Sequence, residues 1–310
     1  MAKTKIEFVC RECGSSHHQW AGQCLDCKEW NTLEEVVISQ ATSSKPESLK
    51  DLPASKVQNL SEIKSQNKNR LSTGLTELDR TLGGGLVDGS VVLIGGDPGI
   101  GKSTLILQAL AAINASSTTL YVSGEESAEQ VSERAIRLGI KEDILFIGET
   151  HLEKIIKISK DLRPKVIVID SIQTMVTDLS NSAPGSVTQV RDCAAQLTQY
   201  AKQTNTILLM IGHVTKGGAL AGPRILEHMV DAVLYFEGDA GGRYRIIRAV
   251  KNRFGAVNEI SVFAMGEKGL QQVSNPSSIF LSNQENPSSG SMVMVTREAT
   301  RPLLVEIQAL

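Results

Sequence analysis

The sequence has no apolar run of the eighteen or so residues that a membrane-spanning helix needs, and its first residues lead into no apolar signal segment. It also has no excess of positive charge, because the formal net charge is −2 over 310 residues. A surface that is basic everywhere is therefore excluded, and any site for a polyanion has to be local. We expect a cytoplasmic protein with no membrane partner.

Cysteine is scarce, with five in the chain, and four of the five form two C-x-x-C pairs near the N-terminus. The paired residues are Cys10, Cys13, Cys24 and Cys27. Four thiolates from two tight turns satisfy a tetrahedral Zn²⁺, and a compact ribbon tolerates the short gap between the pairs. A redox pair is the alternative, which the duplicated motif disfavours. His17 and His18 are expected at the surface, although either can replace a thiol, and the lone Cys193 is expected to pack on a helix.

Composition divides the chain into four segments. Residues 1–35 hold the cysteine pairs and predict a zinc ribbon, whereas 36–70 are rich in Ser, Lys, Asn and Gln and predict a linker. In 71–272, continuous apolar runs alternate with helical patterns, which predicts an α/β domain with a mostly parallel sheet covered on both faces. Residues 273–310 contain a polar stretch and two short strands that cannot cover themselves, as if a further domain began there.

The expected strands and helices of the central segment follow from these runs. Strands are predicted at Val91–Ile94, Leu120–Val122, Val166–Ile169 and Ile207–Ile211, and helices at 103–113, 128–138, 152–161 and 188–203.

A glycine-rich stretch between the first of these strands and the first helix matches G-x-x-x-x-G-K-[ST]. It comprises Gly96, Asp97, Pro98, Gly99, Ile100, Gly101, Lys102 and Ser103, with Thr104 next. Glycine permits a tight path that points backbone N–H groups at phosphate oxygens, and the helix N-terminus adds partial positive charge. We expect Lys102 to bridge the β- and γ-phosphates of ATP and Ser103 to ligate Mg²⁺. A plain glycine-rich turn is the alternative, disfavoured by the flanking strand and helix.

Acidic residues follow two other predicted strands. Asp170 ends an apolar strand, where it can hold the magnesium shell, although an Asp at a strand end often only caps a helix. Glu125 and Glu126 follow the strand at Leu120–Val122, at the edge where open α/β sheets bind ligands. Either can polarise the attacking water, and the alternative is that they favour the dipole of the next helix, which applies more to Glu126 than to Glu125.

Cationic residues gather in the second half of the chain. Lys216 and Arg224 flank a glycine-rich loop that suits a phosphate-sensing switch presenting cations to a second polyanion, unless it is simply a surface loop. Several arginines lie between residues 243 and 253, and some of them are explained as ordinary residues on the solvent-exposed face of a strand. Lys251 and Arg253, however, flank a turn and can reach a phosphate on a neighbouring subunit.

With these residues in hand, the sequence resembles the bacterial RadA (Sms) family of DNA-repair proteins, relatives of RecA. The resemblance covers nearly the whole chain and includes, besides the cysteine pairs and the phosphate loop, the segments Ser72–Gly74, Gly83–Gly85, Tyr121–Ser127, Gly212–Lys216, Leu226–His228 and Lys251–Gly255. The last of these is particularly diagnostic of this family among the RecA-like ATPases. Family members continue into a domain resembling the Lon protease, of which residues 290–310 look like the opening, so the resemblance implies a truncated chain.

The resemblance implies a RecA-like ATPase that binds ATP or ADP with Mg²⁺, forms a hexameric ring and moves on single-stranded DNA. It further implies branch migration of recombination intermediates with RecA in DNA repair. In this interpretation Lys102, Glu125 and Asp170 are catalytic, Lys216 and Arg224 contact DNA, and Lys251 and Arg253 couple nucleotide and DNA contacts across the subunit boundary.

Two other functions stay open at this point. The first is a nucleotide-driven assembly or signalling ATPase resembling KaiC, which would need neither the zinc module nor the Lys251–Gly255 segment. The second is a protease that has lost its catalytic domain, but these residues contain no nucleophile and base arrangement for peptide cleavage.

Overall fold

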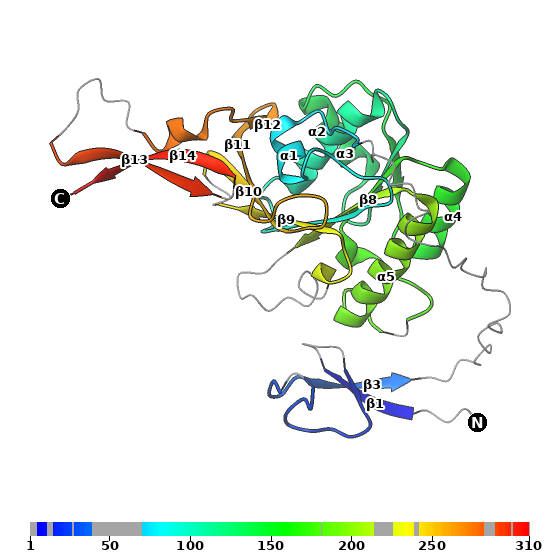
Figure 1. The fold of residues 1–310 in the computed structure, drawn as a ribbon. Helices are drawn as coiled ribbons and strands as arrows, with labels where there is room; N and C mark the ends of the chain where they lie inside the picture. Colours follow the sequence, from blue (N-terminus) through cyan, green and yellow to red (C-terminus); the bar gives the residue numbers. More distant parts are fainter. Residues whose placement is uncertain are drawn as a thin grey trace, which may run out of the picture. The chain divides into compact units, whose positions relative to one another are not determined.

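The computed structural model describes residues 5–10, 15–26, 28–38, 70–180, 182–213, 226–238, 242–281, 289–298 and 300–309. The chain divides into two compact units, Met1–Asn69 and Arg70–Leu310, and Figure 1 labels their elements. The predicted linker at 36–70 lies almost wholly outside the described residues. The four predicted segment boundaries therefore remain a proposal.

The first unit is built on a three-stranded antiparallel sheet in the order β2-β1-β3. Its strands are β1 (Lys5–Cys10), β2 (Ser16–His17) and β3 (Leu33–Ile38). Cys10, Cys24 and Leu33 form its small buried cluster. Phe8 and Ala21 pack against this cluster and are partly buried.

The second unit is centred on a nine-stranded sheet in the order β12-β11-β10-β9-β4-β8-β7-β5-β6. The strands are β4 (Val91–Gly96), β5 (Thr119–Ser123), β6 (Leu145–Gly148), β7 (Val166–Asp170), β8 (Ile207–His213), β9 (Ala232–Glu237), β10 (Tyr244–Asn252), β11 (Ile260–Gly266) and β12 (Gly269–Gln272). From β9 to β6 all neighbours are parallel, whereas β9 to β12 are antiparallel. The predicted α/β fold with a mostly parallel sheet is confirmed, and β6 and the antiparallel extension are additions to it.

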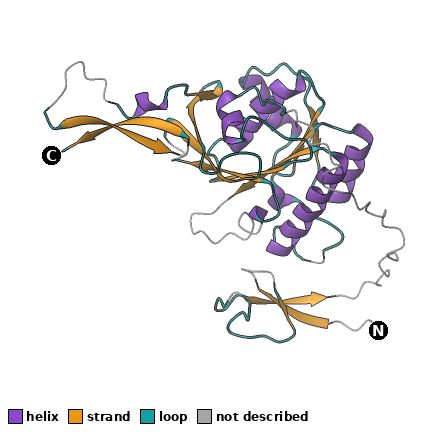
Figure 2. Cartoon of the chain, viewed as in Figure 1, coloured by secondary structure: helices purple, strands orange, loops and turns teal. Residues whose placement is uncertain are grey.

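Helices lie on both faces of this sheet, as Figure 2 shows. They are α1 (Thr76–Thr81), α2 (Lys102–Asn114), α3 (Ala128–Arg137), α4 (Leu152–Leu162) and α5 (Val187–Thr204), with short 3-10 turns η2 (Ile172–Thr174) and η3 (Pro276–Ile279). The four predicted helices are confirmed to within one residue at each end. Local chemistry sets two of the starts: Ser127 and Gln130 form a capping box, and Ser186 accepts the Gln189 N–H.

Two apolar cores cover the two faces. Helices α1, α2 and α3 pack against one face through a cluster that includes Leu105, Tyr121 and Val168. Helices α4 and α5 pack against the other face through a cluster that includes Ile155 and Cys193. Cys193 is fully buried on α5, which confirms its expected packing role, and burial raises the pKa of its thiol to about 12. In the described part of the chain no helix is long and apolar enough to cross a membrane.

A separate hairpin, β13 (Ser291–Glu298) and β14 (Arg301–Gln308), follows the main sheet. Both predicted C-terminal strands are therefore present. A buried ion pair from Arg301 to Glu77 (2.6 Å) ties the base of the hairpin to α1. The apolar side chains of Met292 and Val295 are exposed, as expected of two strands that cannot cover themselves.

Candidate nucleotide-binding site

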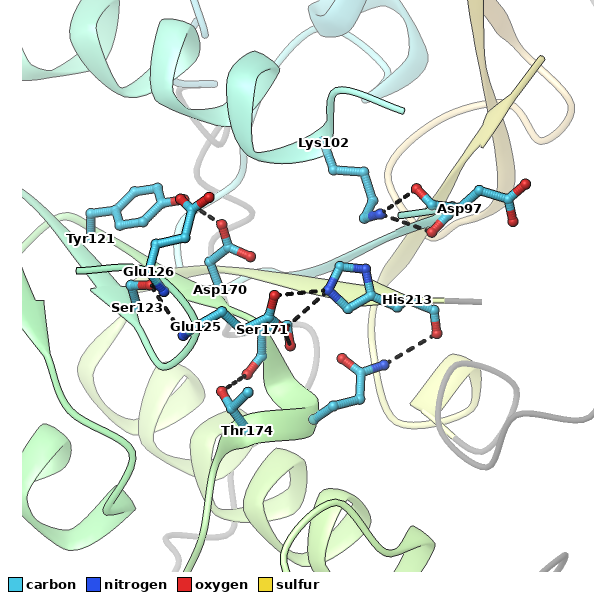
Figure 3. A network of polar contacts seen from close by, with 12 residues as sticks. Asp97, Lys102, Tyr121, Ser123, Glu125, Glu126, Asp170, Ser171, Thr174 and His213 are labelled. Atoms are coloured by element: carbon cyan, nitrogen blue, oxygen red, sulfur yellow. Dashed lines mark hydrogen bonds and ion pairs between the residues drawn. The ribbon is translucent and has the colours of Figure 1, made fainter. Parts of the chain in front are cut away.

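Four neighbouring parallel strands end at one edge of the sheet. Their last residues are Gly96 of β4, Ser123 of β5, Asp170 of β7 and His213 of β8. Gly96 lies opposite His213, and Ser123 lies opposite Asp170. Parallel strands that end together bring side chains from distant parts of the sequence to one place, and this edge is where open α/β sheets bind ligands. Figure 3 shows the side chains of Ser123, Asp170 and His213 gathered there.

The phosphate loop connects β4 to α2 at this edge. Gly99 (φ 75°) and Gly101 (φ 113°) adopt backbone angles that other residues avoid. A Cβ at Gly101 would also lie 2.7 Å from the Met265 methyl group. The sequence therefore needs glycine here for both conformation and space. Helix α2 begins at Lys102, directly after this turn, so its N-terminus and unpaired N–H groups face the loop.

Lys102 is folded into the loop and is only 3% exposed. Its Nζ donates to the carbonyl oxygens of Gly96 and Asp97, each at 2.8 Å. Burial lowers the pKa of Lys102 to about 8, a shift that nearby Asp170 and Glu125 only partly oppose. A phosphate would add negative charge beside this buried ammonium group and so favour its charged form further.

Asp170 is buried at the end of β7, 4% exposed. The hydroxyl of Tyr121 donates to its Oδ2, and the hydroxyl of Ser103 also contacts its carboxylate. Burial raises the pKa of Asp170, while these two hydrogen bonds act in the opposite direction. Ser103 and Asp170 thus place a hydroxyl and a carboxylate oxygen together beside the loop. These are hard oxygen donors, and they fit a Mg²⁺ ion held by few protein ligands and by substrate phosphates.

Glu125 is held from two sides. The hydroxyl of Ser171 donates to Glu125 Oε1, and His213 Nε2 lies 3.1 Å from the same oxygen. The hydrogen bond with His213 is the main reason that the pKa of Glu125 is lowered, so this carboxylate is ionised at neutral pH. Glu126 instead pairs with Arg134 of α3. The two glutamates, which the sequence left as alternatives, therefore have different surroundings, and only Glu125 contacts residues of the β7 and β8 ends.

Tyr121, Ser171 and His213 are site residues that sequence reasoning gave no role. His213 carried one usable signal, because it ends an apolar strand of the parallel sheet. Its backbone carbonyl accepts from Gln173 Nε2 at 3.2 Å. Lys216 and Arg224, the predicted DNA contacts that follow it in sequence, lie outside the described residues.

Lys251 and Arg253 are not brought to the phosphate loop of their own chain. Lys251 pairs in register with Val233, and Arg253 donates to Asp231, whose side chain accepts the N–H of Val91. Val91 is the first residue of β4, whereas the phosphate loop follows the last. The six residues of β4 span roughly 17 Å. The two cations therefore lie at the opposite edge of the sheet from the loop.

The segment that carries these cations is held by the Asn252 side chain and by a close backbone contact at Gly255. Asn252 donates to the carbonyl of Thr81 (3.0 Å) and accepts the Phe254 N–H (2.8 Å). Gly255 packs so closely on Gly83 that a Cβ on it would lie 2.7 Å from the Gly83 Cα. Arg253 itself is more than half exposed, so its guanidinium is accessible from outside the chain.

In the first unit, Cys10 and Cys24 are buried. Cys24 Sγ lies 3.2 Å from Ser15 Oγ and 3.5 Å from His17 Nε2, and His17, Cys24 and Asp26 could together offer ligand atoms to one ion. A thiol, an imidazole and a carboxylate are all donor types that Zn²⁺ accepts. His17 therefore does not sit freely at the surface as expected. Cys13 and Cys27, the other predicted ligands, lie outside the described residues.

The loop, the buried lysine and the strand-end acids define a P-loop ATPase with a RecA-like core, and the first unit, with its cysteines, is a zinc ribbon. A family model described as an AAA domain matches residues 58–219, and a second, described as a rubredoxin metal binding domain, matches residues 8–35. Among curated relatives, the DNA repair protein RadA of Pseudomonas aeruginosa is 56% identical over the whole chain, and those of Haemophilus influenzae and Bacillus subtilis are 52% and 48% identical. The chain spans 69% of the length of each. The chain belongs to the RadA family of DNA-repair ATPases.

Proposed function

We propose that the chain is a DNA-dependent ATPase that translocates on single-stranded DNA as a hexameric ring. In DNA repair it would promote branch migration of recombination intermediates together with RecA, in the cytoplasm. The name of the relatives, DNA repair protein RadA, supports the repair role, and the nucleotide site supplies the energy source.

Within the site each residue has a role that its surroundings suit. Lys102 binds the β- and γ-phosphates, and Ser103 and Asp170 hold Mg²⁺, which neutralises charge that develops on the phosphates. Glu125 is ionised and held by His213 and Ser171, so it can orient the attacking water and accept its proton. Thr104 follows Ser103 in the first turn of α2, where its N–H is free to face the α-phosphate.

The observation that carries the proposal is the placement of Lys251 and Arg253 at the sheet edge opposite the phosphate loop. Cations in that position cannot reach the phosphates of their own chain. They can reach those of a neighbouring copy whose loop edge faces them. Each nucleotide would then lie between two subunits, with Arg253 stabilising transition-state charge in trans.

DNA contact is assigned to the segment that follows His213, in which Lys216 and Arg224 lie. His213, which contacts Glu125, directly precedes this segment in the sequence, and this adjacency supports a coupling between the phosphates and the proposed DNA contacts. The N-terminal module would hold Zn²⁺ through Cys10, Cys13, Cys24 and Cys27.

The first experiment measures ATP turnover with and without single-stranded DNA. We expect stimulation by DNA, and loss of turnover in Lys102→Ala. Turnover that DNA leaves unchanged, together with no mobility shift of single-stranded DNA in ADP or ATP, would refute the translocase. That outcome would favour the assembly or signalling ATPase resembling KaiC.

The second experiment tests the shared site. Lys102→Ala and Arg253→Ala are each expected to be inactive alone. Mixed in equal amounts, they should recover activity at about a quarter of the interfaces, namely those that join an intact loop to an intact arginine. Arg248→Ala, which removes the same residue type from strand β10 just before the cationic segment, is the matched control and should stay active. A mixture as inactive as its parts would show that Arg253 does not act in trans.

A further inference from the structure

Tyr121 is a fully buried tyrosine in the middle of β5. Its ring stacks on Phe146, with the ring centroids 6.3 Å apart, within the core that α2 and α3 cover. Phenylalanine would serve this packing equally well, since the ring makes all of these contacts. A buried hydroxyl is costly unless it has a partner. Packing alone therefore does not explain the oxygen atom.

The partner of this hydroxyl is Asp170. In the parallel pair β5–β7, Tyr121 lies opposite Val168, and Ser123 lies opposite Asp170. Residues two apart on a strand share a face, so the side chains of Tyr121 and Asp170 are both on the face of the sheet that carries α2. The phenol extends along the sheet toward its carboxyl edge and donates to Asp170 Oδ2, as Figure 3 shows.

The contact decides how Asp170 faces the nucleotide. A carboxylate at a strand end rotates about its side-chain bonds, and a hydrogen bond to one oxygen fixes that rotation. With Oδ2 held by Tyr121, Oδ1 is the oxygen left to point toward the metal and its water shell. Groups that orient a metal-binding carboxylate in this way typically change metal affinity by 10- to 100-fold when removed.

A second polar pair lies close to the phenol. Arg134 of α3 pairs with Glu126, and both charges act on Tyr121. The guanidinium also lies near enough to Asp170 for the two charges to attract. Tyr121 and Asp170 are thus a buried polar pair, and the partly exposed Arg134–Glu126 pair adjoins them.

We propose that Tyr121 is a positioning residue for Mg²⁺, which holds Asp170 by its buried hydroxyl so that one carboxylate oxygen faces the metal bound with the nucleotide. This inference rests on the proposed role of Asp170. It assigns no contact between Tyr121 and the metal or the nucleotide.

The test measures binding of Mn²⁺, as a paramagnetic substitute for Mg²⁺, to the full chain with ADP, by electron paramagnetic resonance. In Tyr121→Phe, which removes one oxygen atom and keeps the ring, we expect about tenfold weaker Mn²⁺ binding. ADP affinity in EDTA should not change. Tyr200→Phe makes the same chemical change in a tyrosine of α5 whose hydroxyl lies near Thr204, Thr206 and Ser159, away from the site, and should bind Mn²⁺ like the unaltered chain.

Asp170→Asn separates the two possible failures. If it leaves Mn²⁺ binding intact, the role of Asp170 is wrong and the inference falls with it. If Asp170→Asn weakens binding and Tyr121→Phe does not, Asp170 keeps its role, and the phenol merely has its buried hydroxyl satisfied. A thermal unfolding scan of each variant ensures that only folded protein is compared.

Discussion

Asp231 is a buried carboxylate on which three parts of the second unit converge, and its removal should destabilise the fold measurably. It precedes β9 and is 3% exposed. It accepts the N–H of Val91 at the start of β4 (3.0 Å), pairs with Lys202 of α5, and pairs with Arg253 at 3.2 Å. One side chain thus joins a central strand, a helix and the cationic segment.

The cost of Asp231→Ala can be worked from these contacts. The Val91 N–H lies at a fully buried residue, and leaving it without an acceptor costs about 1–3 kcal/mol. Lys202 and Arg253 are 46% and 59% exposed, so water takes up their charges and each lost pair costs at most ~1 kcal/mol. We expect the free energy of unfolding to fall by about 3 kcal/mol in total. This is below the upper end for breaking a buried ion pair, because both cations remain in contact with water.

The assay is urea unfolding followed by circular dichroism at pH 7. Asp231→Asn keeps an acceptor for Val91 and loses only the charge, so it should cost about 1 kcal/mol. Asp88→Ala is the matched control. Asp88 also forms an ion pair, with Lys165 at 2.7 Å, but it is half exposed, so its removal should cost less than about 1 kcal/mol. A loss no larger for Asp231→Ala than for Asp88→Ala would refute the reasoning.

The pH dependence gives a second check on the same carboxylate. Burial raises the pKa of Asp231, but hydrogen bonds from Lys202 and the Val91 N–H outweigh it, and the pKa is lowered overall. A lowered pKa in the folded state contributes stability above the unfolded value of about 3.9 that is lost as the pH falls through the folded value. The difference between Asp231→Ala and the unaltered chain should therefore shrink below about pH 4.

Three other outcomes follow from the site. Burial lowers the pKa of Lys102 to about 8, and phosphate binding needs the charged form of this side chain. The affinity for ADP, measured by calorimetry, should therefore be constant below pH 8 and fall about tenfold per pH unit above it. An affinity that stays constant up to pH 10 would contradict this. His213→Ala should lower kcat about tenfold with KM for ATP unchanged, whereas His213→Gln, which can still donate to Glu125, should keep most of the activity. Removal of Zn²⁺ by a chelator should unfold the first unit and shift the fluorescence emission of Trp20 and Trp30, the only tryptophans of the chain. A fluorescence spectrum that does not change after the metal is lost would argue against a structural zinc.

The phosphate loop could be predicted from the sequence because its chemistry is contiguous: glycines, Lys102 and Ser103 follow one another between a strand and a helix. Asp170 was predictable for a related reason, since it ends an apolar run. The contacts of Tyr121 and His213 were not. They depend on β5, β7 and β8 being neighbours in a given register, and that order is a long-range property of the sheet.

The arginines between residues 243 and 253 also have roles that the sequence alone could not predict. These arginines look alike in the sequence, but strand β10 alternates in burial. Arg245 turns inward, is 2% exposed, and donates to the Ile100 carbonyl of the phosphate loop at 3.0 Å. Arg248 instead pairs with Glu237 and Glu298. Which arginine supports the loop and which faces solvent follows from the pairing of β10 with its neighbours.

The position of the segment Lys251–Gly255, which carries the two cations, depends on a close contact between Gly83 and Gly255. The two backbones meet where a Cβ on Gly83 would lie 2.8 Å from the Gly255 Cα, and Arg70 also donates to the Phe254 carbonyl at 2.7 Å. A single methyl group added at Gly83, which is neither charged nor near any phosphate, would push this segment aside. The position of Lys251 and Arg253 thus depends on Gly83, a residue without a side chain in a turn far earlier in the sequence.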